Sequence, residues 1–182
     1  MTDLSTLGQV PILGTTRDPV TARLKVEDGN TALDLNRAFR AFQEFELVAG
    51  AELIIQIVSP INFDITGIVL SVDAGEVRYE SISGATELTA FAPITTIFSK
   101  NTRSDAPIYT RVVTAGVGGI ISGGLVLDVA KVKTGTNAQR FSIVEQAQGH
   151  RHVGAGTYYV RLTNTSNSQD ASGIFYAHWD EV

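Results

Sequence analysis

Two stretches near the C-terminus decide the fold class: TYYVRLTN at residues 157–164 and GIFYAHW at residues 173–179. Apolar residues recur at every second position in both, namely Tyr158, Val160 and Leu162 in the first and Phe175, Ala177 and Trp179 in the second. A period of two places such side chains on one face of a β-strand. The polar segment Asn164–Asp170 lies between them and predicts a hairpin loop.

The same alternation extends upstream. Leu53, Ile55 and Ile57 share one face of a predicted strand that ends at Ser59-Pro60. A second strand is predicted over 63–72, where a phase shift near Gly67 indicates a bulge. Pro93 lacks an amide hydrogen, so the apolar segment 89–98 belongs at a sheet edge or a bulge. Further strands are predicted at 22–26, 77–80, 111–115, 124–132 and 139–145.

About nine or ten short strands separated by turn signals favour an all-β fold, an antiparallel β-sandwich or jelly roll. Residues 31–46 leave an alternative open. Leu35, Phe39, Phe42 and Phe45 recur at near-helical spacing, whereas Phe42, Glu44 and Glu46 fit a strand. We therefore expect at most one short helix, or an ordered loop, followed by a strand.

The beginning of the chain has a different character. Residues 1–22 contain scattered prolines and glycines and no sustained period, which predicts an extended N-terminal arm. Its apolar side chains predict that the arm packs on a partner or on its own domain: Leu7, Val10, Ile12 and Leu13. Residues 23–182 are then one β-sandwich domain.

Composition excludes several classes of partner. The net charge is −5 and no basic block is present, so binding to nucleic acid is not expected. The longest apolar run, 115–130, is interrupted by glycines and Asp128 and is too short to predict a membrane span. The N-terminus lacks the pattern of a secretory signal. Since cysteine is absent, disulfides and thiolate metal sites are excluded.

Possible metal ligands are few. His150 and His152 would share a face of a strand, with His178 or Asp180 as a third ligand. Asp28-Gly29-Asn30 and the 164–170 loop carry oxygen ligands of the kind that calcium prefers. We interpret the histidines as a solvated loop and both oxygen-rich segments as turns, so no metal and no cofactor is expected.

Catalytic constellations do not emerge from the sequence either. The carboxylates Asp64, Glu76, Glu80 and Glu87 are spread over strands in the manner of solvated positions, and no nucleophile elbow or phosphate-binding loop is present. The chain is not expected to be an enzyme. Tyr109, Tyr159 and Trp179 are candidates for stacking on sugars or bases. Trp179 is expected in the core, and either Tyr158 or Tyr159 should face outward or into a subunit interface.

Four segments together resemble a group of tailed-phage virion structural proteins: ARLKVEDGNT at 22–31, FRAFQEF at 39–45, AGTYYVRLTN at 155–164 and the aromatic terminus GIFYAHWDE at 173–181. The similarity covers most of residues 20–182 in order. Residues 31–40 depart from the group, because they are richer in Ala and Leu. The resemblance implies a capsid decoration or cement protein with a jelly-roll-like sandwich, and it carries over no catalytic residue.

We therefore expect a protein that is made in the host cytoplasm and lies on the capsid surface of the virion. Its expected partners are the major capsid protein and itself, as a homotrimer matched to a local threefold axis. The alternative is a receptor- or glycan-binding head-fibre or tail module that uses the loops 100–107 and 164–170 with exposed aromatics such as Tyr109.

Overall fold

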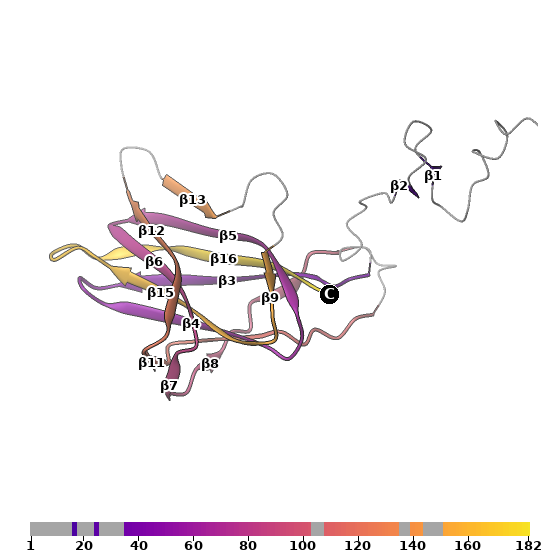
Figure 1. Cartoon of the computed structure of the whole chain (residues 1–182). Coiled ribbons are helices and arrows are strands. Elements are labelled where there is room, and N and C mark those ends of the chain that lie inside the picture. Colours follow the sequence, from indigo (N-terminus) through magenta and orange to yellow (C-terminus); the bar gives the residue numbers. More distant parts are fainter. Residues whose placement is uncertain (1–15, 18–23, 26–34, 103–107, 135–138, 144–150) are drawn as a thin grey trace, which may run out of the picture. The chain divides into compact units, whose positions relative to one another are not determined.

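The computed structural model describes residues 16–17, 24–25, 35–102, 108–134, 139–143 and 151–182 (Figure 1). The chain divides into two compact units, Met1–Thr31 and Ala32–Val182. In the first unit, β1 (Thr16–Arg17) pairs antiparallel with β2 (Leu24–Lys25). β2 lies within the strand expected at 22–26. The apolar arm residues Leu7, Val10, Ile12 and Leu13 and the turn at 28–30 lie outside the described residues.

The second unit is a β-sandwich, which confirms the predicted all-β fold. Its strands pair only antiparallel in the described residues, which contain no helix. One sheet has the order β12-β6-β15-β4-β10-β8 and the other β13-β5-β16-β3-β9, with β14 also paired to β5. The sandwich is built mainly from these strands, in which β13 and β14 share one place beside β5: β3 (Ala38–Leu47), β4 (Glu52–Ser59), β5 (Phe63–Ala74), β6 (Glu76–Ser83), β12 (Leu125–Lys133), β13 (Gln139–Ile143), β14 (Arg151–Val153), β15 (Gly156–Asn164) and β16 (Ala171–Glu181).

The strand order is that of a jelly roll. The strands β3, β4, β5 and β6 alternate between the two sheets, the chain folds back from β6 to the adjacent β12, and β13/β14, β15 and β16 alternate again. This winding produces the two Greek keys of a double-sheet jelly roll. In the described part of the chain, no helix is long and apolar enough to cross a membrane.

Residues between β6 and β12 form further short strands: β7 (Thr86–Thr89), β8 (Ala92–Pro93), β9 (Ile97–Ser99), β10 (Thr114–Val117) and β11 (Ile120–Ser122). β7 and β11 pair with each other in a separate two-stranded sheet. β9 pairs with β3 at one sheet edge, while β10 and β8 extend the other sheet beside β4. Pro93 lies in the outermost strand, β8, as its missing donor requires.

The core confirms the alternation read from the sequence. Trp179 is buried between the sheets with Phe39 and Phe63, while Leu70, Tyr79, Leu162 and Phe175 belong to the main core. The pairing of β16 with β5 skips Thr66, since His178 faces Gly67 and Trp179 faces Ile65, so the bulge predicted near Gly67 is confirmed.

Of the alternatives left open for residues 31–46, the described part shows a turn at 35–36 followed by a strand and no helix, because Phe39, Ala41, Phe45 and Leu47 point into the core at alternate positions of β3. One local prediction is wrong. The Asn164–Asp170 segment is no hairpin loop: β15 pairs with β4 and β6, whereas β16 pairs with β3 and β5. The loop therefore crosses from one sheet to the other.

Candidate functional site: an aromatic face with charged ends

The histidines considered as metal ligands do not converge, and His152 lies on a strand and not in the solvated loop expected from the sequence. His152 lies on β14 with its side chain 83% exposed, and its Nδ1 is 2.5 Å from Oδ1 of Asp64. Asp180 lies beside Asp64 in the sheet, but His178 is opposite Arg40 instead. No group of three His, Asp or Glu side chains in the described residues is arranged to hold a metal ion. His150 lies outside the described residues.

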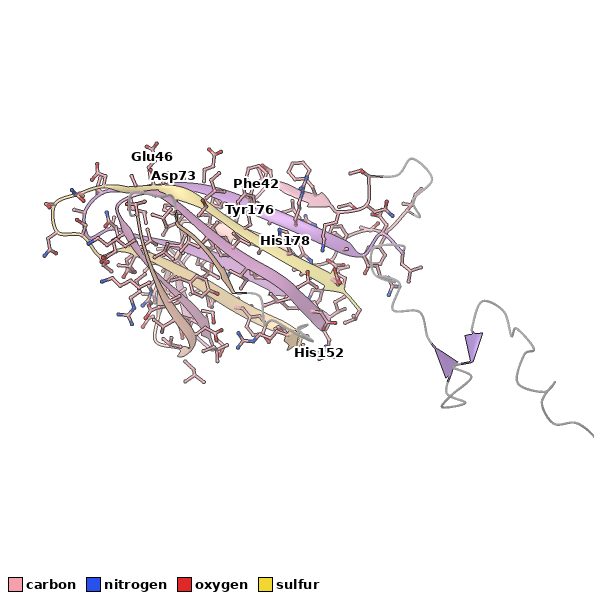
Figure 2. All side chains as sticks on the ribbon, turned by 90° about the horizontal axis from the view of Figure 1, so that it is seen from above. Phe42, Glu46, Asp73, His152, Tyr176 and His178 are labelled. Atoms are coloured by element: carbon pink, nitrogen blue, oxygen red, sulfur yellow. The ribbon has the colours of Figure 1, made fainter. Side chains whose placement is uncertain are left out.

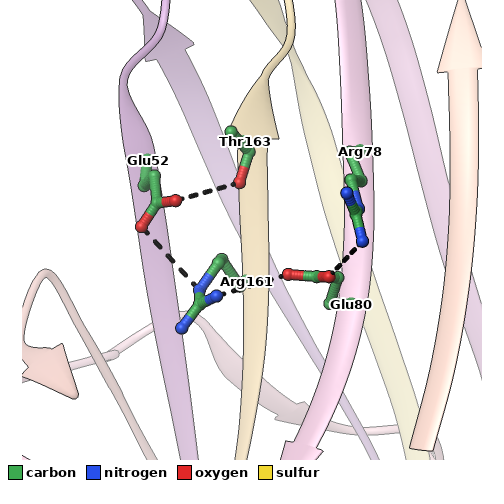
Figure 3. Close-up of polar contacts among 5 residues, drawn as sticks. All are labelled: Glu52, Arg78, Glu80, Arg161 and Thr163. Carbon is green, nitrogen blue, oxygen red and sulfur yellow. Dashed lines mark hydrogen bonds and ion pairs between the residues drawn. The ribbon is translucent and has the colours of Figure 1, made fainter. Parts of the chain in front are cut away.

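The acidic residues expected to be solvated prove to be of two kinds. Asp64 and Glu80 are buried, so their prediction as solvated positions is wrong, whereas Glu87 is exposed. Glu80 is buried because two cations compensate its charge: its Oε1 is 2.7 Å from Nη2 of Arg78, and its Oε2 is 3.4 Å from Nη1 of Arg161. Arg161 also contacts Glu52 at 3.7 Å, which joins three adjacent strands of one sheet (Figure 3).

A second ion pair connects the two sheets at their edge. Arg151 on β14 pairs with Asp128 on β12, whose Oδ2 also accepts a hydrogen bond from Ser81 Oγ at 2.7 Å. Burial raises the pKa of Asp128, but the hydrogen bonds from Arg151 and Ser81 outweigh it, and the pKa of this carboxyl lies below its ordinary value. The pair therefore stabilises the sandwich only while Asp128 is ionised.

Glu181 was not singled out from the sequence, although it is 1% exposed. Its carboxylate accepts hydrogen bonds from the backbone amides of Val112 (3.0 Å) and Val113 (2.9 Å) and from Nε1 of Trp179 (3.4 Å). These contacts fasten the segment before β10 to the last strand. In the sequence, the only indication of this role is an acidic residue two positions after Trp179. The amides that bind it lie far away in sequence, so their contact could not be predicted.

The 164–170 loop is explained by turn chemistry, as expected. Asn164 is buried, and its Nδ2 donates to the carbonyls of Leu47 and Gln169. Its Oδ1 accepts from the amide of Ser166 at 2.9 Å, an Asx-type turn. The amide side chain organises the crossing between the sheets.

The three aromatic side chains considered for stacking on sugars or bases pack mainly against other side chains of the protein. Trp179 and Tyr159 are buried, the latter against Phe91 with ring centroids 5.8 Å apart. Tyr109 is partly exposed and packs between Phe39 at 6.2 Å and the guanidinium of Arg37 at 5.0 Å. Burial and a hydrogen bond to Glu181 raise the pKa of Tyr109.

A different aromatic group stands on the outside of the molecule. Phe42 on β3 lies between Phe98 on β9 and Tyr176 on β16, with ring centroids 6.1 Å apart in both pairs (Figure 2). Tyr176 is opposite Phe42 on one side and Val69 of β5 on the other. Phe98 is 48% exposed, and the other three are partly exposed. We call this row of Phe98, Phe42, Tyr176 and Val69 the aromatic face.

The aromatic face lies between ends of opposite charge. Exposed carboxylates stand toward one end of the strands, where Figure 2 labels Glu46 and Asp73; Glu44 is the next outward residue of β3 after Phe42. Arg40, Lys100 and His178 lie toward the other end. Burial, followed by the charges of Lys100 and Arg40, lowers the pKa of His178, so its imidazole is neutral at pH 7.

A second exposed apolar surface lies on β12, the outermost strand of the other sheet. Leu125 is 67% and Val129 is 56% exposed, and Val126 and Leu127 also face solvent. An apolar edge strand can pair with another chain, and exposed apolar patches mark interaction sites. Both surfaces are suited to binding proteins.

In comparisons with known proteins, no protein-family model, curated protein or solved structure matches the chain.

Proposed function

We propose that this protein is a non-catalytic structural component of a phage particle, a decoration protein that binds the outer surface of the head and stabilises the shell. The observation that carries the proposal is the exposed apolar surface of a tightly packed jelly roll, on the aromatic face and along β12. Aromatic side chains are enriched where proteins contact each other. The resemblance of the four segments quoted above to phage structural proteins is the reason for placing this contact on a phage particle.

Shell stabilisation requires only modest individual contacts. A decoration protein binds many equivalent positions, and a self-associating one joins neighbouring capsomers, so weak contacts act together through effective concentration. In this proposal the arm of residues 1–22 contributes a contact to the capsid or to a neighbouring subunit through its apolar side chains.

Binding to purified, expanded heads that lack the protein tests the proposal. We expect saturable co-sedimentation of the full-length protein at a stoichiometry that follows capsid symmetry, and weaker binding after deletion of residues 1–20. A Glu87→Gln variant, altered at an exposed position of β7 outside both surfaces, is a control for nonspecific charge effects. Failure of the full-length protein to bind such heads would contradict the proposal.

The second candidate is a glycan- or receptor-binding module of the particle, and the aromatic face is the observation that favours it. Rings exposed on a sheet can stack on the apolar faces of sugars, while neighbouring carboxylates and Arg40 offer hydrogen bonds. Adsorption to host cells or their surface polysaccharide that is lost in Phe42→Ala, without binding to heads, would select this candidate.

A further inference from the structure

The outward residues of β3 have an ordered charge pattern. Arg40, Phe42, Glu44 and Glu46 occupy alternate positions of one strand, so a positive charge, an aromatic ring and two negative charges follow each other on the same side of the sheet. On the flanking strand, the Lys100 amide binds the carbonyl of Ala38, which places Lys100 beside the positive end. Along β3 the aromatic face is therefore apolar in the middle and electrically asymmetric.

A surface of this kind is complementary to itself. If a second copy is turned so that its strands run in the reverse direction, its negative end lies over the positive end of the first copy. The rings of the two copies then meet in the middle. A turn that keeps the strand direction would place like charges together, which is unfavourable. The charges thus select one relative orientation.

We propose that the aromatic face binds the same face of a second copy of this chain. The two-fold axis lies in the interface and runs across the strands, along the row of rings. Arg40 of one protomer then lies opposite Glu44 of its partner, and Lys100 lies toward Glu46 of its partner. Each contact occurs twice, as an isologous interface requires.

The packing of this dimer follows ordinary rules for sheets. Two sheets that pack face to face keep their strand directions within about 30° and are separated by about 10 Å, a distance that large aromatic side chains fill. Phe42 and Tyr176 would lie at the centre, desolvated and surrounded by the charged contacts, where aromatic residues contribute most to binding.

This inference deepens the self-association in the proposed function and does not depend on binding to a capsid. It replaces the threefold association expected from the sequence with a two-fold contact. If the protein dimerises but does not bind heads, the decoration role fails while the dimer stands. If it binds heads as a monomer, the dimer fails while the decoration role stands.

The test is the molecular mass of the full-length protein in solution, measured by sedimentation equilibrium between low and high micromolar concentration. We expect a monomer–dimer equilibrium for the wild type. Arg40→Glu and Glu44→Arg each reverse two symmetric contacts and should each weaken the dimer about tenfold or more, an effect of about 1.4 kcal/mol. The combined variant R40E/E44R restores opposite charges across the interface and should dimerise within about threefold of the wild type.

The controls separate an interface from a general effect. Lys133→Glu changes an exposed charge on the other sheet and should leave dimerisation unchanged. Phe42→Ala should weaken the dimer at least as much as the charge reversals, and circular dichroism verifies that each variant is folded. A wild type that is monomeric or trimeric at all concentrations would overturn the inference. So would a dimer that the single charge reversals leave intact, or one that the combined variant fails to restore.

Discussion

The buried carboxylate of Glu181 allows a quantitative prediction for Glu181→Gln. Glutamine has the same shape, but it is uncharged and presents one accepting oxygen in place of two. In the native protein Oε1 accepts from the amides of Val113 (2.9 Å) and Val112 (3.2 Å), Oε2 accepts from the amide of Val112 (3.0 Å), and Nε1 of Trp179 lies 3.4 Å from Oε1. The substitution therefore places an NH₂ group, which cannot accept, against the Val112 amide and leaves that amide only its longer bond to Oε1.

The magnitude follows from these contacts. Hydrogen bonds to a charged group contribute about 1.5–3 kcal/mol, and those between neutral groups about 0.5–1.5 kcal/mol. Losing charge assistance from two bonds costs about 2 kcal/mol, and replacing the shorter bond of the Val112 amide by a contact with an NH₂ donor adds about 1 kcal/mol. We expect the free energy of unfolding to fall by about 3 kcal/mol, which lowers Tm by about 10 °C for a chain of this size.

Urea unfolding followed by circular dichroism measures this change, since the signal does not depend on Trp179. Glu87→Gln is the matched control, because Glu87 is exposed and its carboxylate accepts a hydrogen bond from Nε2 of Gln56. Glutamine keeps one side-chain oxygen that can accept this bond. It should change stability by less than about 0.5 kcal/mol. If Glu181→Gln is equally mild, the carboxylate does not hold the segment before β10, and the reasoning is refuted.

Three further predictions concern the packing and the ion pairs. Gly173→Ala should lower the unfolding free energy by at least about 2 kcal/mol in urea titrations, because a Cβ there would collide with the carbonyl oxygen of Ser71; a smaller loss would show that the strands can separate. The lowered pKa of His178 means that the unfolded state binds more protons just below pH 6.5. The urea midpoint should therefore drop between pH 7.5 and 5.5, and drop less in His178→Gln; equal drops would contradict the assignment. Arg151→Ala should cost about 0.5–1 kcal/mol at pH 7, and this difference should fade as the pH falls below 3.8, because the lowered pKa of Asp128 lies beneath that value; a loss that is as large at pH 2 as at pH 7 would contradict it.

Local periodicity was sufficient to predict much of the sandwich. The alternation of Leu53, Ile55 and Ile57 and of Phe175 and Trp179 predicts strands, because a half-buried strand has only one apolar face. The phase shift near Gly67 predicts the bulge for the same reason. These features depend on neighbours in sequence, and they are confirmed.

Features that depend on distant pairing were missed. A polar loop such as 164–170 has the same composition whether it joins two paired strands or crosses between sheets, so the hairpin prediction was wrong. Glu80 is buried because its cations lie on its own strand and on β15. The aromatic face escaped notice because Phe42 and Tyr176 become neighbours only through the register of β3 with β16.

The central claim is that the protein reinforces a phage head, and heat-induced release of DNA from heads tests it most directly. Heads that lack the protein are heated alone, with saturating full-length protein, and with protein that lacks residues 1–20, while DNA release is followed by dye fluorescence. The account predicts that the full-length protein raises the release temperature and that the deletion reduces this gain. An unchanged release temperature at saturating binding would show that the protein attaches to the head without stabilising it, which contradicts the claim.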